Sequence, residues 1–341
     1  MLLLDIVFYS FVVIVCIQVV YYGIIFGSFA FHNPIKKKHK NLSVSVLICA
    51  KNEAENLKQF LPSILNQDYE NFEVVLINDA SSDDSLDIME AFSEKHSNIK
   101  IVNVKNIEAF WANKKYALTL GIKAAKNDYL LFTDADCKPV SKHWISEMTP
   151  HFSTDNTIVL GYGAYDKIKS SFLNSIIRFE TLLTAIQYFS FAKIGIPFMG
   201  VGRNLAYNRS EFFKTNGFIK HIDVRSGDDD LFINEAANSK NTSICFTRES
   251  FTTSKPKTSF KAWFRQKRRH VSTSKRYKFI HKALLALFYI TQMLFWLFSI
   301  VLLIALFYWK FVLALILLRF IVQYLVFGFS AKKLNEFDII I

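Results

Sequence analysis

Apolar residues follow two kinds of pattern along this chain. At both ends they form long uninterrupted runs, and between the ends short apolar runs alternate with segments of helical spacing. Residues 6–31 contain no charged side chain. As a helix this run would be about 39 Å long, more than the roughly 30 Å hydrocarbon core of a membrane. We therefore predict an uncleaved transmembrane anchor over residues 1–32, with a cleaved signal peptide as the alternative.

A second apolar region predicts a transmembrane helical hairpin over residues 283–330, followed by a tail over residues 331–341. Lys310 interrupts this region, so we expect the turn of the hairpin at residues 308–310. Arg319 lies well inside the last segment. A charged residue at that depth faces a partner, a cavity or a lipid headgroup, or it snorkels from a shifted span.

Residues 33–282 show the alternating pattern. Apolar runs predict strands over residues 44–49, 72–77, 99–104, 129–133 and 158–161, and helical spacing predicts helices over residues 55–65, 85–95, 113–126 and 171–191. Strands that alternate with helices indicate an α/β domain with a mostly parallel sheet. The last of these helices is amphipathic, so it either lies near a membrane surface or packs as an ordinary helix.

The formal net charge of +12 is concentrated beside the apolar regions. Every charged residue from Ser250 to Asn335 is basic, and three lysines at residues 36–38 follow the first apolar run. With three spans and the N-terminus outside, these basic flanks fall on one side, which the positive-inside rule makes the cytoplasm. Charge at membrane edges favours anionic lipid over nucleic acid as a partner. The four cysteines are widely separated, which indicates reduced thiols.

Acidic side chains follow two of the predicted strands. Asp134 and Asp136 come directly after one strand, and Asp79 comes after another. Because the carboxyl ends of parallel strands meet at one edge of a sheet, we expect these carboxylates to converge on one ligand. Carboxylates are ligands that Mg²⁺ and Mn²⁺ prefer, so Asp134 and Asp136 predict a metal site beside a diphosphate. Alternatively, two acids near a loop are simply solvated.

A third polar cluster, Ala50-Lys51-Asn52-Glu53, follows the first strand of the domain. Alternatively, Asn52 and Glu53 only form the capped start of the following helix. Helix capping also accounts for Ser82 and Asp83, but it does not account for Asp79.

Seven motifs in this order resemble the signature of family 2 glycosyltransferases of the GT-A fold. They are residues 49–53 (CAKNE), 78–83 (NDASSD), 113–118 (NKKYAL), 134–136 (DAD), 200–206 (GVGRNLA), 227–231 (GDDDL) and 266–270 (QKRRH). The similarity covers about residues 43–272. Each motif is weak by itself, and the ordered set carries the resemblance.

The resemblance implies a role for each matching residue. The nucleoside would be held by Ala50, Asn52, Glu53 and Asp79. The diphosphate would be bound by Lys114 or Lys115, and by Gln266 and Arg269. The nucleotide and the metal, Mg²⁺ or Mn²⁺, would be bound by Asp134, Ala135 and Asp136, with Asp136 as the main metal ligand. The acceptor side would include Gly202, Asn204, Asp230 and His270.

The catalytic base is ambiguous, because three aspartates are consecutive in the acidic motif. Alignment from Gly227 points to Asp229, which we favour, and alignment from Leu231 points to Asp228. On one helical turn the two would project about 100° apart, so we expect only one to face the acceptor. His270 stands where the family usually has tryptophan, and this weighs against processive polymer synthesis.

The sequence thus predicts an inverting, metal-dependent glycosyltransferase in a cytoplasmic (inner) membrane, with its catalytic domain in the cytoplasm. It would move a sugar from a nucleotide sugar, for which we expect a UDP-sugar, to a hydroxyl of a lipid-linked or saccharide acceptor. Such a reaction belongs to polysaccharide, glycolipid or cell-envelope biosynthesis. One alternative is the same fold charging a polyprenyl phosphate. The other is a catalytically silent assembly subunit that binds nucleotide sugars.

Overall fold

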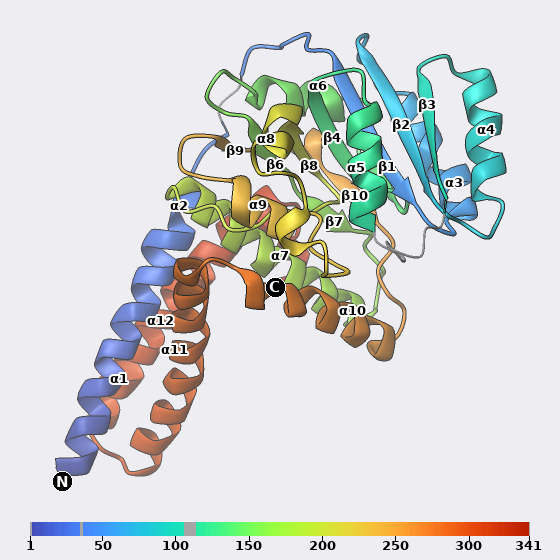
Figure 1. Cartoon of the computed structure of the whole chain (residues 1–341). Helices are drawn as coiled ribbons and strands as arrows, with labels where there is room; N and C mark the ends of the chain where they lie inside the picture. Colours follow the sequence, from blue (N-terminus) through green and yellow to red (C-terminus); the bar gives the residue numbers. More distant parts are fainter. Residues whose placement is uncertain (1, 35–36, 106–113, 341) are drawn as a thin grey trace.

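Two β-sheets organise the centre of the chain. The computed structural model describes residues 2–34, 37–105 and 114–340 (Figure 1). A seven-stranded sheet has the order β3-β2-β1-β4-β8-β6-β9, and a three-stranded sheet has the order β5-β10-β7. The strands are β1 Val44–Ala50, β2 Phe72–Asp79, β3 Ile99–Val104, β4 Tyr129–Asp134, β5 Cys137–Pro139, β6 Ile158–Leu160, β7 Gly163–Tyr165, β8 Leu205–Asn208, β9 Thr242–Ile244 and β10 Thr252–Ser254.

Helices cover the sheets and extend away from them. They are α1 Leu2–Val20, α2 Gly27–Ala30, α3 Ala54–Leu65, α4 Ser85–Lys95, α5 Lys114–Ala124, α6 Trp144–Met148, α7 Phe172–Lys193, α8 Arg209–Lys214, α9 Asp230–Ala236, α10 Phe260–Thr273, α11 Phe279–Ile304 and α12 Trp309–Lys333. A π-helical segment, Tyr21–Phe26, joins α1 to α2. The predicted strands and helices of the α/β domain lie within two residues of those observed, except that Asn113, expected to begin α5, is outside the described residues.

The first four strands form the parallel half of the large sheet. β1 pairs in parallel with β2 and β4, and β2 pairs in parallel with β3. β8 is antiparallel to β4. Of these strands, β1, β2 and β4 are buried on both faces, which explains why they are continuous apolar runs in the sequence, whereas the edge strand β3 is partly exposed. The mostly parallel α/β sheet is therefore confirmed.

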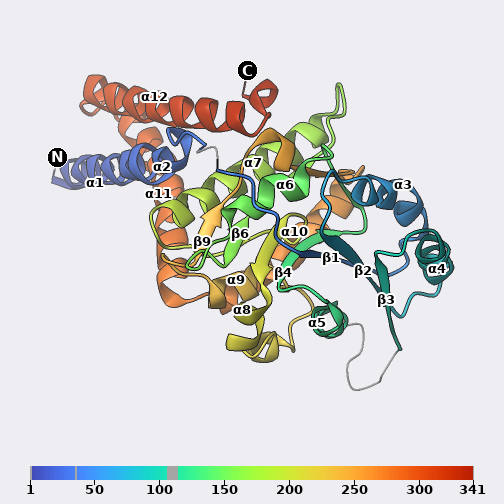
Figure 2. The ribbon, with the colours of Figure 1, turned by 90° about the horizontal axis from the view of Figure 1, so that it is seen from above.

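Successive residues of β1 enter two separate apolar cores. Val46 and Ile48 belong to the core that α3, α4 and α6 cover, whereas Leu47 belongs to the core that α5 covers. This follows from the alternation of side chains along a strand. Figure 2 shows α3 and α5 on opposite sides of β1–β3. α5 lies close to the sheet because Gly121 has no side chain, and a Cβ there would lie 2.1 Å from Cδ1 of Ile77. This close packing places the N-terminus of α5 at the carboxyl edge of the strands.

Three helices project from the domain as a bundle (Figure 1). The segments Leu2–Ala30, Phe279–Ile304 and Trp309–Lys333 are each long and apolar enough to cross a membrane. Apolar side chains of α1, α11 and α12 form a core within the bundle, which includes Phe11, Phe295 and Val312. At its upper end this bundle joins the domain, because Phe29 stacks on Phe189 of α7 with ring centroids 5.0 Å apart.

α7 is a packed helix of the domain. Twelve of its 22 residues are buried, and the Ser171 side chain caps its N-terminus by accepting from the backbone N–H of Asn174. The sequence allowed this helix either to lie near a membrane surface or to pack as an ordinary helix of the domain, and the structure supports the packed helix.

The hairpin between α11 and α12 turns earlier than expected. The connection is formed by residues 305–308, and Trp309 and Lys310 already belong to α12. Arg319 points into the bundle and is 2% exposed. Its guanidinium donates to Oε1 of Gln292 at 2.6 Å and to Oε1 of Gln323 at 2.5 Å. Of the alternatives for Arg319, the structure therefore supports hydrogen-bond partners inside the bundle over a side chain that snorkels to the membrane surface.

The chain after α12 returns to the domain. Glu336, which is 2% exposed, accepts a 2.8 Å hydrogen bond from Nε of Arg178 in α7, and Asp338 also pairs with Arg178. Buried opposite charges require such close pairing, since desolvation of an unpaired charge is costly. These contacts attach the C-terminal segment to α7.

Candidate active site

The carboxyl ends of β1, β2 and β4 converge on one edge of the large sheet. β4 ends at Asp134, and Asp136 lies in the two-residue turn before β5. Carboxylate oxygens of Asp134 and Asp136 lie within 4.8 Å of each other and of Sγ of Cys137. Because β4 and β5 belong to different sheets, the short turn between them holds both carboxylates at the junction of the sheets.

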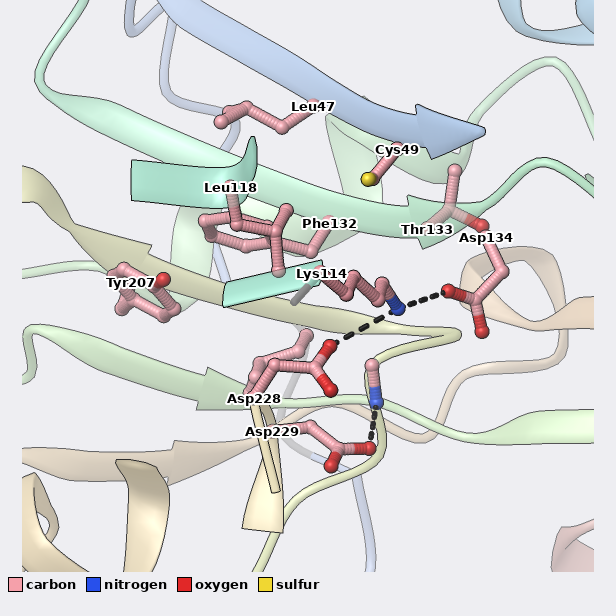
Figure 3. Close-up of a pocket in the computed structure, with 12 residues that line it drawn as sticks. Leu47, Cys49, Lys114, Leu118, Phe132, Thr133, Asp134, Tyr207, Asp228 and Asp229 are labelled. Atoms are coloured by element: carbon pink, nitrogen blue, oxygen red, sulfur yellow. Dashed lines mark hydrogen bonds and ion pairs between the residues drawn. The ribbon is translucent and has the colours of Figure 1, made fainter. Parts of the chain in front are cut away.

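Lys114, the first residue of α5, connects two acidic segments (Figure 3). Its Nζ lies 2.8 Å from Oδ1 of Asp134 and 3.0 Å from Oδ2 of Asp228. Burial lowers the pKa of the Lys114 ammonium, but the charges of Asp134 and Asp228 outweigh burial and raise its pKa well above its usual value. The group therefore stays charged, and it partly neutralises both carboxylates.

Asp228 and Asp229 line the same small pocket as Lys114 and Asp134 (Figure 3). We expected only one of them to face the site, on the premise that both lie on the first turn of a helix. That premise is wrong, because both residues lie in the turn before α9. Gly227 makes this turn possible. Its φ of +93° suits glycine, and a Cβ would lie 2.5 Å from Cδ1 of Leu231.

Asp229 has a carboxylate held by backbone donors. Oδ2 accepts a 2.7 Å hydrogen bond from the N–H of Gly202, and Oδ1 accepts one of 2.7 Å from the N–H of Asp230. Burial, and then the negative charges of Asp228 and Asp230, raise the pKa of the Asp229 carboxyl to about 7. A carboxyl group with a pKa near neutral pH is suited to act as a general base.

Gly202, which the resemblance assigns to the acceptor side, has a structural reason to be glycine. A Cβ at this position would lie 3.3 Å from Oδ2 of Asp229, the oxygen that its own N–H binds. A side chain would therefore displace the carboxylate.

The ends of β1 and β2 form the opposite side of the site. Asp79 is the last residue of β2 and is 9% exposed, with Nζ of Lys51 3.9 Å from its Oδ2. Asn52 has a φ of +57°, and its Oδ1 accepts a 2.8 Å hydrogen bond from the N–H of Ser82. This contact joins the loop after β1 to the loop after β2, as the convergence of strand ends predicts. Ala50 is the buried last residue of β1.

Helix capping explains part of this cluster. Asp83 accepts from the N–H of Ala54, the first residue of α3, at 3.2 Å, and from the N–H of Ser85, the first residue of α4, at 3.0 Å. Glu53 precedes α3 and accepts a 2.5 Å hydrogen bond from Nδ2 of Asn56. Asp83 thus organises both helix starts, whereas Asp79 has no capping contact among the hydrogen bonds of the described residues.

Arg203 is a site residue that sequence reasoning missed. Its guanidinium stacks 4.2 Å over the ring of Tyr165 and donates to Oγ of Ser254 at 2.9 Å. Its positive charge lowers the pKa of both Asp134 and Asp136, although burial has a larger, opposing effect on each. The signal was available, because Arg203 lies inside the motif at residues 200–206.

α10 carries the last motif beside this cation. Nε2 of Gln266 lies 3.4 Å from the hydroxyl of Tyr165, so it reaches the ring on which Arg203 stacks. Arg269 is exposed. Burial raises the pKa of Asp134, but the charges of Lys114, Arg203 and, less strongly, Arg269 lower it below its usual value. His270 is also exposed. Gln266 and Arg269 therefore lie on the side of the site that Asp134 faces.

Three predicted site residues are used elsewhere. Lys115 is fully buried, and its Nζ donates to the carbonyls of His221 and Val224, so Lys114 is the lysine at the site. Asn204 is also fully buried. Its Oδ1 accepts from Nε1 of Trp144 at 3.0 Å, and its Nδ2 donates to two carbonyls, so it belongs to the core and not to the acceptor side.

Asp230 is the third such residue. It is 7% exposed, and the Tyr277 hydroxyl donates to its Oδ2 at 2.7 Å. The sequence expected Asp230 on the acceptor side, but its partner in the structure is the hydroxyl of Tyr277.

The donor set around Asp134 fits a hard divalent cation. Two carboxylates supply oxygen, which Mg²⁺ and Mn²⁺ prefer. Burial, and then the charges of Asp134 and Asp136, raise the pKa of the Cys137 thiol well above its usual value, so the protonated sulfur is a weak donor. Asp134 and Asp136 are therefore the residues that could hold the metal.

Comparison with known proteins agrees with this geometry. The family model described as Glycosyl transferase family 2 matches residues 45–214. An uncharacterized glycosyltransferase of Rickettsia bellii is 31% identical over 147 residues, which are 42% of this chain and 20% of that protein. The cholesterol galactosyltransferase of Borreliella burgdorferi is 37% identical over 93 residues, 27% of this chain and 25% of that protein. The matches thus span a minor part of these relatives.

The fold also has a counterpart among solved structures. The mannosyltransferase PcManGT of Pyrobaculum calidifontis, solved in complex with GDP-Man and Mn²⁺, superposes with a TM-score of 0.56 at 17% identity. The match covers 94% of this chain and 99% of that one, which shows a shared fold. This likeness and the mixed sheet identify the fold as GT-A. The match of the family model shows that residues 45–214 belong to glycosyl transferase family 2.

Proposed function

We propose that this protein is an inverting, metal-dependent glycosyltransferase that moves a sugar from a nucleotide sugar to an acceptor hydroxyl at a membrane surface. The observation that carries the proposal is the pocket in Figure 3. In it a candidate metal ligand, Asp134, and a half-buried carboxylate of raised pKa, Asp229, lie on either side of Lys114 and Asp228. This arrangement supports a donor site and an acceptor site that meet in one place.

The donor would lie along the strand ends. Asp79 and the loop at Asn52 are placed for the nucleoside, and Lys114 for the diphosphate. Bound at Asp134 and Asp136, Mg²⁺ or Mn²⁺ would stabilise the negative charge that develops on the leaving diphosphate. Arg203 and Arg269 supply further positive charge on that side, and a guanidinium binds phosphate oxygens through two parallel hydrogen bonds. The GDP-Man and Mn²⁺ bound by PcManGT support such a donor.

Asp229 would act as the base. The acceptor hydroxyl loses its proton as the new sugar–oxygen bond forms, and Asp229 would take that proton. The N–H groups of Gly202 and Asp230 orient the carboxylate, and Asp228 faces Lys114 instead. These different partners favour Asp229 as the base.

We further propose that the three long apolar helices span a cytoplasmic membrane and that the domain lies in the cytoplasm. The basic residues before α11 and after α12 then lie at the cytoplasmic surface, as the positive-inside rule requires. α10 exposes Phe264 and Val271 together with Arg265 and Arg268, which suits contact with an anionic membrane surface. The acceptor would be a lipid-linked or saccharide hydroxyl compound presented there, in polysaccharide, glycolipid or cell-envelope synthesis.

A panel of nucleotide sugars tests this proposal. The full chain in membranes would be supplied with UDP- and GDP-sugars and with Mg²⁺ or Mn²⁺, and nucleoside diphosphate release would be measured. Release with one donor, dependent on metal and on an added membrane-lipid extract, is expected, and we expect that donor to be a UDP-sugar. Donor binding without release would instead support a silent assembly subunit. Release that needs a polyprenyl phosphate would support the other alternative.

A further inference from the structure

Hydrogen bonds join α9 to the segment at the start of the apolar helix α11. Oδ2 of Asp230, the first residue of α9, accepts a 2.7 Å hydrogen bond from the hydroxyl of Tyr277, which lies two residues before α11. The hydroxyl of Thr273, the last residue of α10, lies 2.5 Å from the same oxygen. Oδ1 accepts a third bond, of 2.8 Å, from the N–H of Leu231.

A second contact lies one helical turn further along α9. Oδ1 of Asn234 accepts a 2.9 Å hydrogen bond from the N–H of Lys278, and Nδ2 of Asn234 lies 2.8 Å from Nδ1 of His281. Asn234 and His281 are both buried. Residues four apart lie on one face of a helix, so Asp230 and Asn234 form a continuous seam against residues 277–281.

This seam begins directly after the turn that holds Asp228 and Asp229. Tyr277 and Thr273 are as buried as Asp230, so the carboxylate has protein donors in place of water. Hydrogen bonds to a buried charged group are strong, and a missing partner leaves the charge uncompensated. The seam therefore holds the turn firmly at its C-terminal end, while Gly202 holds Asp229 at the other side.

We infer that Asp230 is a positioning residue that fixes the Asp228–Asp229 turn to the start of α11, so that the seating of this apolar helix determines where the base lies. The inference rests on the proposed function, because it gives the turn a catalytic role. It differs from the acceptor contact expected for Asp230, since Asp230 acts through Asp229 and does not touch substrate.

The positioning role of the seam can be tested by a measurement that does not depend on enzyme activity. Tyr277→Phe removes one donor to Asp230 and keeps the ring. Tyr188→Phe is the matched control, because the hydroxyl of Tyr188 is equally buried and donates at 2.7 Å to the carbonyl of Gly161. Hydrogen exchange of the amides of residues 225–233 should become at least about fivefold faster in Tyr277→Phe and stay unchanged in Tyr188→Phe. Equal exchange in the two variants would overturn the inference.

Kinetics test the consequence for the base. Tyr277→Phe and Thr273→Val should each lower kcat about tenfold with little change in the KM for the donor, and Thr273→Ser, which keeps the hydroxyl, should retain wild-type turnover. Asp230→Asn removes a negative charge beside Asp229, so the pKa of Asp229 falls and the acidic limb of the pH–rate profile moves to lower pH. Because that shift follows from the lost charge alone, the positioning role is judged on Tyr277→Phe and Thr273→Val, and a kcat of these variants equal to that of Tyr188→Phe would also overturn the inference.

The two experiments separate the inference from the function on which it rests. If the wild-type protein releases no nucleoside diphosphate but the exchange difference is present, the seam is correct and the proposed function is wrong. If release is normal and the variants match Tyr188→Phe in both exchange and kinetics, the function stands and the seam has no positioning role.

Discussion

Nζ of Lys114 lies 3.0 Å from Oδ2 of Asp228, and the same ammonium contacts Asp134 at the end of β4. One side chain thus links the strand end that would hold the metal to the turn that would hold the base. Lys114 therefore lies between the proposed donor side and the proposed acceptor side.

The two adjacent lysines should respond differently to the same substitution. Lys114→Met should lower nucleoside diphosphate release at least about tenfold with little loss of stability, because it removes the charge between Asp134 and Asp228. Lys115→Met should lower the free energy of unfolding by about 1–3 kcal/mol, because buried carbonyls lose their donor. Release assays and thermal unfolding of both variants check this. Similar effects of the two substitutions on both measurements would contradict the assignment.

Replacing the base should remove most turnover and change its pH dependence. Asp229→Asn should cut turnover by at least about 10²-fold with little change in donor affinity, since an amide cannot accept the proton. Asp228→Asn should cost less, and Asp87→Asn, on the surface of α4, serves as a control.

The wild-type pH–rate profile follows from the pKa of Asp229, which is raised to about 7. The ionised carboxylate is the active form, so turnover should rise as pH increases through about 7 and be lost below it. The measurement is nucleoside diphosphate release from pH 5 to 9. If Asp228→Asn and Asp229→Asn both turn over at nearly the wild-type rate, no base is needed and the polyprenyl-phosphate alternative is preferred.

Metal dependence should be carried by the carboxylates of the candidate metal site. Asp136→Asn should leave the fold intact and abolish turnover, because an amide neutralises a divalent cation less well than a carboxylate does. Added Mn²⁺ should raise the melting temperature of the wild type and not that of the variant. Near-normal turnover of the wild type in EDTA would refute metal dependence.

Charge placement predicts the topology. A cysteine introduced at Lys310 should react with a membrane-impermeant maleimide from outside the cell, and one introduced at Lys282 should react only after the membrane is opened. The comparison requires a background in which Cys16, the exposed natural cysteine, is replaced. Labelling of position 310 only from the cytoplasmic side would reverse the orientation.

The basic segment before α11 should matter only on charged membranes. Reversing Lys275, Arg276 and Lys278 to glutamate should lower activity several-fold in anionic nanodiscs and leave donor binding in detergent unchanged. Reversal of the exposed residues Lys95, Lys123 and Lys126, at the C-terminal ends of α4 and α5, is the control. Equal activity of both triple variants in anionic nanodiscs would argue against lipid docking.

Local pattern in the sequence was sufficient for β1–β4 and β6, for α3, α4, α5 and α7, and for the α/β class, but it did not predict the short strands β5 and β7–β10. The apolar runs that form β1, β2 and β4 are buried on both faces, and such continuous apolar runs by themselves indicate a parallel sheet. The same reasoning placed Asp79 and Asp134 at one edge, because strand ends align in a parallel sheet. The three long apolar segments needed only length and composition to be identified as candidate spans.

Roles that depend on side-chain direction needed the tertiary structure. Lys114 and Lys115 are neighbours in sequence, yet one faces the acidic pocket and the other the loop at residues 221–224, because successive helix positions point about 100° apart. Asp228, Asp229 and Asp230 are chemically identical, and their partners Lys114, Gly202 and Tyr277 come from distant segments. Sequence spacing records neighbours along the chain, whereas these contacts depend on how α5, α9 and α11 pack around the sheets.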